Sequence, residues 1–411
     1  MNRPLEAYYG LPNEVKFCKR CVISNQRPSS TIEFRSSREE AKKVIHFDEE
    51  GICSACRYQE HKEQAIDWQE RDSRLRELLA PFKRNDGGYD VVVPGSGGKD
   101  SAFTAHVLKY RYGMNPLTVT WAPHLYTDIG WKNFQNWMHA GGLDNILYTP
   151  NGRLHRLMTR NAFLNLLHPF QPFIVGQRII GPAMARRFGV RLVMYGENQA
   201  EYGNAIEENR RPEMSKDFFS VEDPYEMMFG GVPLREYIDR EGFSFNDFAP
   251  YLAPTREQLD QAEVEVHYLG YYLKWDPQEC YYYAVENTGF EANTERTEGS
   301  YSKYSSIDDK IDPFHYYTTL IKFGIGRATY DAAQEVRNDK ITREEAVYLV
   351  EKYDQEFPQK YYKEFLNYIG LTDSEFTEAV DKFRSPHLWA NTPNGWRLRH
   401  TVGARGLDDP H

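Results

Sequence analysis

The pattern of apolar residues changes from strand-like to helix-like across residues 91–110. Val91–Val93 is a run of β-branched side chains, which pleated strands favour. From Ala102 to Tyr110 the apolar side chains recur at helical spacing. A glycine-rich loop, Pro94–Ser101, joins the two patterns. The sequence therefore predicts a strand, a turn and a helix, and the rest of the chain is arranged around this unit.

Strand-like and helix-like patterns alternate on both sides of this unit. A helical pattern precedes it from Ile66 to Leu79. Three further strands are predicted after it, at 116–121, 145–149 and 190–195, with helical segments between them. This alternation is typical of an α/β fold with a doubly wound parallel sheet. In such a sheet ligands bind beyond the carboxyl ends of the strands.

The patterns divide the chain into four parts. We expect a small N-terminal module at 1–65, the sheet domain at 66–204, an insertion at 205–296 and a helical C-terminal part at 297–411 that completes the active site. The insertion is rich in charge and has few long periodic stretches, so it is interpreted as a lid or a subunit contact. Helical periodicity returns from Asp331 to Tyr353, where Thr342 and Glu345 have capping-box spacing. After Pro386 we expect an irregular terminus.

The loop between the first strand and its helix has the composition of a phosphate site. Glycines lack Cβ and let backbone N–H groups approach phosphate oxygens, while the helix N-terminus adds its positive dipole end. Ser96 and Ser101 add hydroxyl donors. Asp100 would repel a bare phosphate, so it predicts a Mg²⁺ ion that bridges to the ligand. The alternative is that Asp100 or Ser101 only caps a helix after a glycine turn.

The loop lacks the glycine and the hydroxyl that a Walker A motif requires at these spacings. It resembles instead the Ser-Gly-Gly-x-Asp-Ser loop of the PP-loop ATP pyrophosphatases, which hold the β,γ-pyrophosphate of ATP while a substrate oxygen attacks the α-phosphorus. The resemblance implies that ATP is bound by Ser96, Gly97, Gly98, Lys99, Asp100 and Ser101. It also implies that the adenine lies near Thr120 and Trp121, at the end of the second strand.

Four of the five cysteines form two Cys-x-x-Cys pairs, Cys18/Cys21 and Cys53/Cys56. Two such pairs bring four thiolates to one point, which is the arrangement that a tetrahedral structural Zn²⁺ requires. A redox pair or an iron–sulfur cluster is the alternative. Cys280 stands alone in an aromatic stretch and is expected to be a buried core thiol.

Two acidic residues follow the fourth predicted strand, within Tyr195–Asn204. Glu197 and Glu201 would face the same crevice as the phosphate loop and are candidates to bind Mg²⁺ or to take a proton from ammonia, Glu197 being preferred. A similar Gly-Glu turn lies beside the adenylate in asparagine synthetase. The alternative is that both are acids in the first turn of the next helix.

A third informative stretch runs from Thr297 to Arg327. Lys322 and Arg327 flank a Gly-x-Gly sequence, which predicts a clamp on the charge of the leaving pyrophosphate. These two cations and Lys303 could instead be solvated or paired with nearby acids, namely Asp308, Asp309 and Asp312. Three further residues of the stretch are candidates to contact the substrate, namely Tyr301, Lys303 and His315.

The formal net charge of −10 and the pI near 5.7 argue against a nucleic-acid partner, because such binding depends on Lys and Arg contacts to phosphate. No segment has the roughly 20 apolar residues that span a bilayer, and Met1–Glu6 has no apolar signal core. We therefore expect a cytoplasmic protein without a membrane partner.

The motifs together resemble the N-acetyl sugar amidotransferases, most nearly the WbpG-like type of lipopolysaccharide O-antigen synthesis. The shared features, from Cys18 to about Tyr353, are the cysteine pairs, the phosphate loop, His168–Phe170, Tyr195–Asn198, Lys322–Arg327 and Glu335–Ala346. The resemblance implies ATP-dependent conversion of an acetamido group of UDP-2,3-diacetamido-2,3-dideoxy-mannuronic acid to acetamidino, through an adenylated intermediate and ammonia. The cofactors would be Mg²⁺ and Zn²⁺, and the catalytic residues Asp100, Glu197, Lys322 and Arg327.

The chain has no recognisable glutaminase half, because the one cysteine outside the two pairs, Cys280, follows Glu279, whose carboxylate disfavours a thiolate. The resemblance implies that separate glutaminase and cyclase-like subunits supply the ammonia. A PP-loop enzyme that modifies tRNA, with the cysteine pairs in an RNA-binding module, is the alternative function. A non-catalytic scaffold is a third hypothesis, against which the intact loop Ser96–Ser101 argues.

Overall fold

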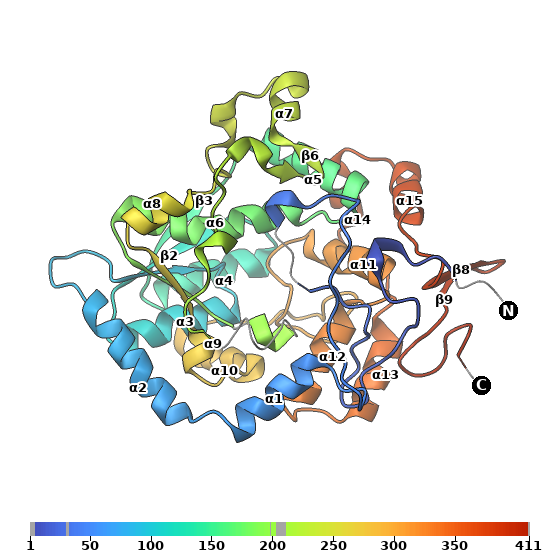
Figure 1. The fold of residues 1–411 in the computed structure, drawn as a ribbon, viewed down its shortest axis with the longest axis horizontal. Coiled ribbons are helices and arrows are strands. Elements are labelled where there is room, and N and C mark those ends of the chain that lie inside the picture. The colour runs from blue at the N-terminus through green and yellow to red at the C-terminus, as the bar shows by residue number, and fades with distance from the viewer. Residues whose placement is uncertain (1–4, 30–32, 198, 203–210, 410–411) are drawn as a thin grey trace.

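The computed structural model describes residues 5–29, 33–197, 199–202 and 211–409 (Figure 1). Its centre is a five-stranded parallel sheet, so the predicted doubly wound α/β fold is confirmed. In spatial order the strands are β3 Asp144–Tyr148, β2 Pro116–Trp121, β1 Val91–Pro94, β4 Leu192–Tyr195 and β7 Glu265–Tyr268. Because β1 lies between β2 and β4, the winding of the chain reverses beside β1, at the position where such sheets bind ligands.

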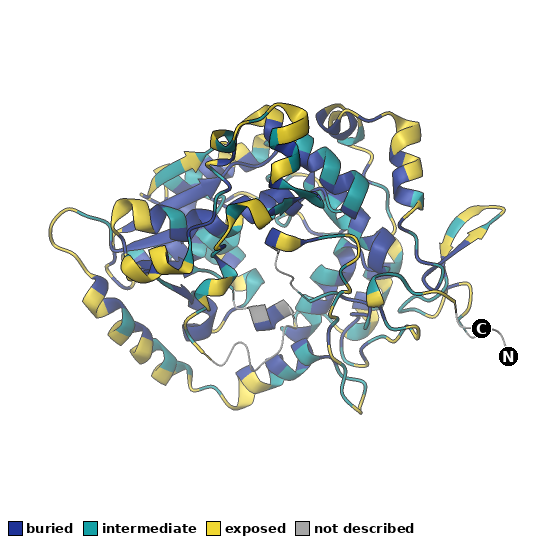
Figure 2. Cartoon of the chain, turned by 45° about the horizontal axis from the view of Figure 1, so that its top comes forward, coloured by how far each residue is buried: buried dark blue, intermediate teal, exposed yellow. Residues whose placement is uncertain are grey.

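Alternate residues of β1 enter different hydrophobic cores. Val91 and Val93 pack with residues of α2 and α3, whereas Val92 packs on the opposite face with residues of α5 and α6. This is the period-two geometry of a strand buried on both sides. The helices around the sheet are α2 Trp68–Leu79, α3 Lys99–Tyr110, α4 Asp128–His139, α5 Gly152–Leu166, α6 Gln171–Phe188, α9 Leu269–Tyr272 and α10 Pro277–Thr288. Figure 2 shows the buried strands in dark blue and the outer faces of the surrounding helices in yellow.

The range 205–296 contributes to the sheet as well as lying over it. Its strand β7 pairs with β4 and forms one edge of the sheet, a strand that the sequence pattern did not predict. Its helix α10 packs against α3 on one face of the sheet. Between β4 and α9 the range also contains β5 Met228–Phe229, β6 Val232–Pro233, α7 Leu234–Glu241 and α8 Arg256–Gln261. The parallel sheet therefore extends beyond residue 204.

The C-terminal part is helical, as predicted, and ends in a hairpin. Its elements are α11 Asp312–Phe323, α12 Arg327–Arg337, α13 Arg343–Tyr353, α14 Tyr362–Ile369, α15 Asp373–Asp381, β8 Trp389–Thr392 and β9 Gly395–Leu398. The predicted capping box of Thr342 and Glu345 is present. The expectation of an irregular terminus after Pro386 was wrong, because β8 and β9 pair in antiparallel register around the turn-forming residues Pro393 and Asn394.

The N-terminal module has one long helix, α1 Ser54–Gln64, and extended chain that lies beside α11–α13 (Figure 1). Short 3-10 helices occur at Tyr8–Gly10, Glu33–Arg35, Ala80–Phe82, Gln199–Tyr202, Lys216–Phe218, Pro224–Glu226 and Phe245–Phe248. Among the residues that the structure describes, none of the helices combines the length and apolar character needed to cross a bilayer.

Candidate functional site

The phosphate loop follows β1 and packs so tightly that two of its positions admit only glycine. A Cβ on Gly95 would lie 2.1 Å from the Cβ of Ser101. Gly97 has a φ of +83°, and a Cβ there would lie 2.9 Å from the Cα of Phe134 in α4. The amide of Gly97 donates to the hydroxyl of Ser101 (3.2 Å), and that hydroxyl donates to the carbonyl of Gly98 (3.1 Å). Ser101 therefore closes the loop.

Asp100 does not cap the helix. The residue before α3 is Gly98, and no side chain accepts a capping hydrogen bond there. The carboxylate of Asp100 instead contacts the Lys99 ammonium, with an Oδ2–Nζ distance of 2.5 Å. Burial disfavours the Lys99 ammonium, but nearby negative charge, mainly that of the Asp100 carboxylate, outweighs this effect, so the pKa of Lys99 is raised above its ordinary value. The loop therefore presents one cation and one anion at the start of α3.

Two cavities meet at this loop. The larger, which we name the central cavity, has a volume of about 620 Å³ and is lined by Ser96–Asp100 and by residues of 302–340. The smaller, the switch-point cavity, has a volume of about 410 Å³ and is lined by Pro94–Ser96 after β1 and by Tyr195–Glu197 after β4. Both are lined by Asp100 and Gln177. The carboxyl ends of β1 and β4 thus open onto one continuous region, as predicted for a doubly wound sheet.

The C-terminal part reaches the loop because residues 307–312 dock onto the end of β2. The Oδ2 atom of Asp309 accepts from the backbone N–H of His124 (2.8 Å) and contacts the Nδ1 atom of its ring (2.7 Å). A Cβ on Gly130 would lie 2.4 Å from the Cα of Asp308, so only glycine permits this approach. Asp308 and Ser96 of the phosphate loop then line the same cavity, and burial raises the pKa of Asp308.

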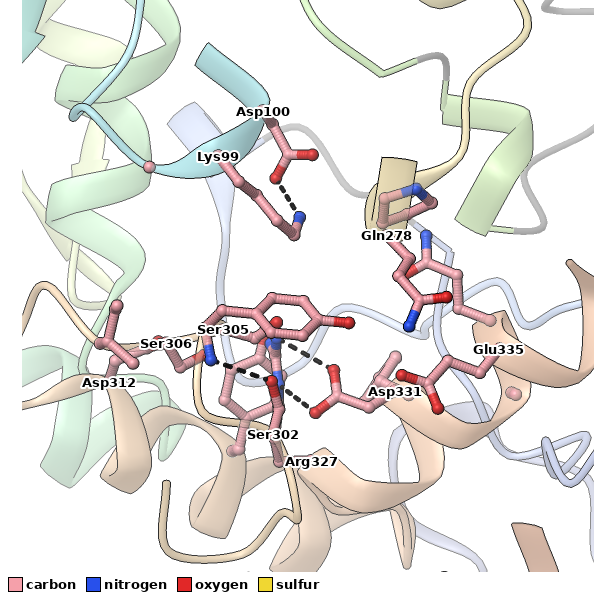
Figure 3. A pocket seen from close by; sticks show the side chains of 18 of the residues that line it. Lys99, Asp100, Gln278, Ser302, Ser305, Ser306, Asp312, Arg327, Asp331 and Glu335 are labelled. Atoms are coloured by element: carbon pink, nitrogen blue, oxygen red, sulfur yellow. Dashed lines mark hydrogen bonds and ion pairs between the residues drawn. The ribbon is translucent and has the colours of Figure 1, made fainter. Parts of the chain in front are cut away.

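Arg327 and Glu197 both lie at this region, but in different cavities. Arg327 lines the central cavity, where its Nη2 atom lies 3.1 Å from Oδ1 of Asp331 and its guanidinium lies 4.4 Å from the Tyr316 ring centroid. Glu197 lines the switch-point cavity together with Asp100. Figure 3 shows Lys99 and Asp100 on one side of the central cavity, with Arg327 and Asp331 on the other. Residues 198 and 203–204 of the predicted Glu197 stretch lie outside the described residues.

Lys322 is not among the residues that line these two cavities. It is only 8% exposed, and its Nζ atom donates to the carbonyl of Leu166 (2.8 Å). The Gly-x-Gly sequence ends α11 and leads into α12, so that Lys322 on one helix is separated from Arg327 on the next. The predicted clamp is therefore divided between two places in the structure.

Thr120 and Trp121 also lie away from both cavities. The hydroxyl of Thr120 accepts from the side-chain amide of Asn145 (2.9 Å) inside the sheet. Trp121 is buried against α6, where a Cβ on Gly176 would lie 2.2 Å from the indole. The expected adenine position is thus occupied by packed side chains at Trp121, and the open volume lies nearer β4.

Several weaker candidates have structural partners. The Glu201 carboxylate is buried and ion-paired with Lys62, with an Oε1–Nζ distance of 2.6 Å. Lys303 donates to the Thr294 carbonyl, and the Tyr301 hydroxyl donates to Glu335 (2.8 Å). His315 lines the central cavity.

The acidic residues on one side of the central cavity were not predicted from the sequence. Asp331 and Glu335 follow Arg327 at four-residue intervals, so all three lie on one face of α12 and line the cavity. That spacing was visible in the sequence and is the signal that could have identified them. Asp276, from the beginning of α10, also lines the cavity and lies far away in the sequence.

Asp312 lies in the wall of the central cavity, and burial raises its pKa to about 7, although Arg327 opposes the shift. The protonated Asp312 carboxyl therefore makes its full contribution to the stability of the fold below about pH 4. This contribution is lost as the pH rises toward 7. Between about pH 4 and 7 we expect the free energy of unfolding of the Asp312→Asn variant to rise relative to that of the wild type. Above about pH 7 the difference between the two proteins is expected to stay constant. Urea unfolding between pH 4.5 and 8 measures this, with the exposed Glu344→Gln as matched control. A pH-independent difference for Asp312→Asn would contradict the assignment.

The four paired cysteines converge as predicted. Cys18, Cys21, Cys53 and Cys56 are buried, and their Sγ atoms all lie within 4.8 Å of one another. The Sγ–Sγ distance is 3.9 Å for Cys18 and Cys56 and 3.8 Å for Cys21 and Cys53. With metal–sulfur bonds of about 2.3 Å, a tetrahedral ion places its ligands roughly 3.8 Å apart. The thiol cluster therefore fits one metal ion and is also compatible in composition with an iron–sulfur site.

The cysteine cluster is connected to the central cavity. Arg343 of α13 donates to the carbonyl of Cys21 (3.2 Å) and to that of Cys18 (3.4 Å). Ile23 and Ala55, each two residues or fewer from a cysteine, line the central cavity. Arg337 also lines it, is buried, and lies close enough to the cysteines for thiolate charge to raise its pKa, although burial opposes this. The N-terminal module thus forms part of the cavity wall.

Comparison with known proteins supports the sequence resemblance in the C-terminal part. Residues 298–402 match the family described as "LPS biosynthesis protein WbpG-like, C-terminal domain", which confirms the predicted WbpG-like resemblance for this part of the chain. A curated relative, the uncharacterized protein MJ1599 of Methanocaldococcus jannaschii, is 30% identical over 78 residues, which cover 19% of this chain and 27% of the relative.

Two solved structures align with parts of this chain at low sequence identity. The NH3-dependent NAD synthetase from Campylobacter jejuni matches with 17% identity and a TM-score of 0.27, covering 33% of this chain and 59% of that chain. The U34-tRNA thiolase NcsA from Methanococcus maripaludis matches with 15% identity and a TM-score of 0.32, covering 82% of this chain and 88% of that chain.

Proposed function

We propose that this protein is an ATP-dependent amidotransferase that converts an acetamido group of a nucleotide-activated sugar to acetamidino, with UDP-2,3-diacetamido-2,3-dideoxy-mannuronic acid as the substrate. One observation carries the proposal. The segment that matches the WbpG-like family and the phosphate loop Ser96–Asp100 line the same central cavity. A phosphate loop thus faces residues of a polysaccharide-synthesis family across a single site.

The chemistry has two steps. An acetamide is a poor electrophile, so its carbonyl oxygen first attacks the α-phosphorus of ATP, and the bond to the β-phosphate breaks to release pyrophosphate. Ammonia then attacks the carbon of the adenylated imidate. The carbon–oxygen bond breaks, AMP departs with the bonding electrons and the former acetamide oxygen, and the amidine remains.

The loop and the facing cations would stabilise the charge that develops on phosphate. Backbone N–H groups of the loop and the Lys99 ammonium lie on one side of the cavity, and Arg327 lies on the other. Asp100, which lines both cavities, would supply the hard carboxylate oxygen that Mg²⁺ prefers, and Glu197, which lines the switch-point cavity, would supply a second. A bound Mg²⁺ would neutralise phosphate charge and orient the leaving pyrophosphate.

Ammonium must lose a proton before its nitrogen can attack. Asp312, whose pKa is raised to about 7 by burial, is suited to accept a proton near neutral pH. Cys280 is buried as predicted, and burial raises its pKa well above the ordinary value, so it is unsuited to act as a glutaminase nucleophile. We therefore propose that separate glutaminase and cyclase-like subunits supply ammonia in the cytoplasm.

We assign the four-cysteine cluster to a structural Zn²⁺. Four thiolates leave no open position for chemistry, and the Sγ separations fit a single ion. The ion would hold together a module that has little regular structure and that supplies Ile23 and Ala55 to the cavity wall.

The test is release of pyrophosphate and AMP from the purified protein with Mg-ATP and ammonium chloride, with and without the UDP-diacetamido-uronic acid. We expect release that requires the sugar, together with a sugar product whose mass differs by replacement of O with NH. Bulk tRNA is the parallel substrate. Turnover with tRNA alone would refute the proposal and favour a tRNA-modifying enzyme.

A further inference from the structure

A third cavity of about 220 Å³, which we name the basic cavity, lies where four parts of the chain meet. It is lined by residues 28–29, 36–38 and 42 of the N-terminal module, by the end of α5, by α11, and by Phe383 after α15. Lys322 and His168, two residues of the motifs that the phosphate loop does not explain, both line this cavity.

The two neighbouring cavities differ in the charges that line them. Arg38, Lys42 and Lys322 line the basic cavity, and among its lining residues in the described part of the chain there is no carboxylate. Glu40 lies outside the lining, with its carboxylate 3.3 Å from the Nζ atom of Lys42. Among the described residues, the central cavity is lined by six carboxylates, namely Asp100, Asp276, Asp308, Asp312, Asp331 and Glu335, and by five cations, namely Arg27, Lys99, Arg327, Arg337 and Lys340. Its charges are therefore mixed, whereas the charged residues that line the basic cavity are all cations, so an anionic group of a ligand meets no opposing carboxylate in the lining there.

The backbone at the end of α5 is shaped to build this cavity. Leu167 has a left-handed φ of +44° although it is neither glycine nor asparagine, and it is fully buried. That conformation is sterically unfavourable for a residue with a Cβ. It ends α5 so that Leu166, Leu167 and His168 all line the basic cavity, with the Leu166 carbonyl bound to Lys322.

The basic cavity adjoins the central cavity. His315, Thr319 and Tyr330 line both, so these side chains form the common wall. The ring of His315 lies parallel to that of His168, with centroids 5.2 Å apart. One ligand that passes this wall can place different groups in the two cavities.

We propose that the basic cavity binds the phosphate groups of the nucleotide-linked second substrate, while the reacting part of that substrate lies in the central cavity. This inference rests on the proposed function for the identity of the substrate. Lys322 and Arg38 supply the charge-assisted hydrogen bonds that phosphate oxygens accept. The hydroxyl groups of three serines that line the same cavity supply neutral hydrogen-bond donors, namely Ser29, Ser36 and Ser37. Lys322 therefore acts on the second substrate and not on the pyrophosphate of ATP.

Binding of UDP, measured by calorimetry in the presence and absence of a non-hydrolysable ATP analogue, tests the inference without any turnover. We expect UDP and the analogue to bind together. In Lys322→Met we expect the Kd for UDP to rise about tenfold or more, with the Kd for the analogue unchanged. Arg38→Gln, at an exposed position, is expected to weaken UDP binding in the same direction. Lys363→Met, exposed on α14, is the matched control and is expected to bind both ligands as the wild type does.

Competition between UDP and the ATP analogue would overturn the inference, since it would assign these phosphate contacts to ATP. Failure of the wild type to bind UDP, or unchanged UDP binding in both Lys322→Met and Arg38→Gln, would also overturn it. If the sugar assay fails while UDP binding responds to these variants, the proposed reaction is wrong and the phosphate site stands.

Discussion

Replacement of Gly97 by alanine is expected to lower kcat/KM for ATP at least about hundredfold, the loss that follows when reacting groups are misplaced by about 1 Å. The added Cβ would lie 2.9 Å from the Cα of Phe134 and 3.2 Å from the carbonyl oxygen of Asn133. These are backbone atoms of α4, which cannot move aside as a flexible side chain would. The loop must therefore shift and carry its N–H groups away from the phosphate position. Pyrophosphate release under saturating sugar and ammonia measures the effect.

Gly87→Ala is the matched control for this variant. Gly87 has nearly the same backbone conformation, with a φ of +84°, but a Cβ there would meet no atom within 4 Å. Each variant loses about 1–2 kcal/mol of stability from the left-handed conformation. Only Gly97→Ala is expected to lose activity. Equal activities in the two variants would show that close packing of the loop against α4 is irrelevant to ATP binding.

Replacement of Cys53 by serine is expected to reduce bound zinc from one equivalent per chain to well below one. It should also lower the free energy of unfolding by on the order of 5 kcal/mol, because binding energy at a structural four-thiolate site is folding energy. The loss is expected to begin in the N-terminal module, which has few regular elements of its own. Metal analysis of the purified protein and limited proteolysis before residue 65 measure both effects. Detection of iron in the purified wild type would show that the four cysteines hold an iron–sulfur cluster and not a zinc ion.

Cys280→Ser separates the loss of a buried thiol from the loss of a metal ligand. Cys280 is 2% exposed in α10 and is not part of the four-cysteine cluster. Its serine variant buries a hydroxyl and is expected to cost only about 1–3 kcal/mol, with the zinc content unchanged. Zinc loss in Cys280→Ser as large as in Cys53→Ser would contradict the assignment of the cluster.

Local sequence determined the sheet core and its loop. The strand patterns predicted β2 at its observed bounds and placed β1, β3 and β4 within two residues. For β1, β2 and β4 the reason is burial on both faces, which favours largely apolar runs, whereas β3 is a partly exposed edge strand. The spacing of the phosphate loop and of the cysteine pairs predicted a strand–loop–helix unit and a thiol cluster, both of which the structure contains. In each case the residues that act together are close in the chain or repeat a short motif.

Tertiary structure decided which distant residues share a cavity. Strand β7 was not predicted because its four residues, Glu265–Tyr268, become a strand only by pairing with β4. Lys322 and Arg327 are five positions apart but line different cavities, because a left-handed Gly324 ends one helix before Arg327 begins the next. Asp309 binds His124 and thereby brings residues 307–312 onto the phosphate loop, which the sequence did not predict. Spacing along a chain reports local geometry, whereas the meeting of segments nearly 200 residues apart depends on side-chain contacts that form only when the chain has folded.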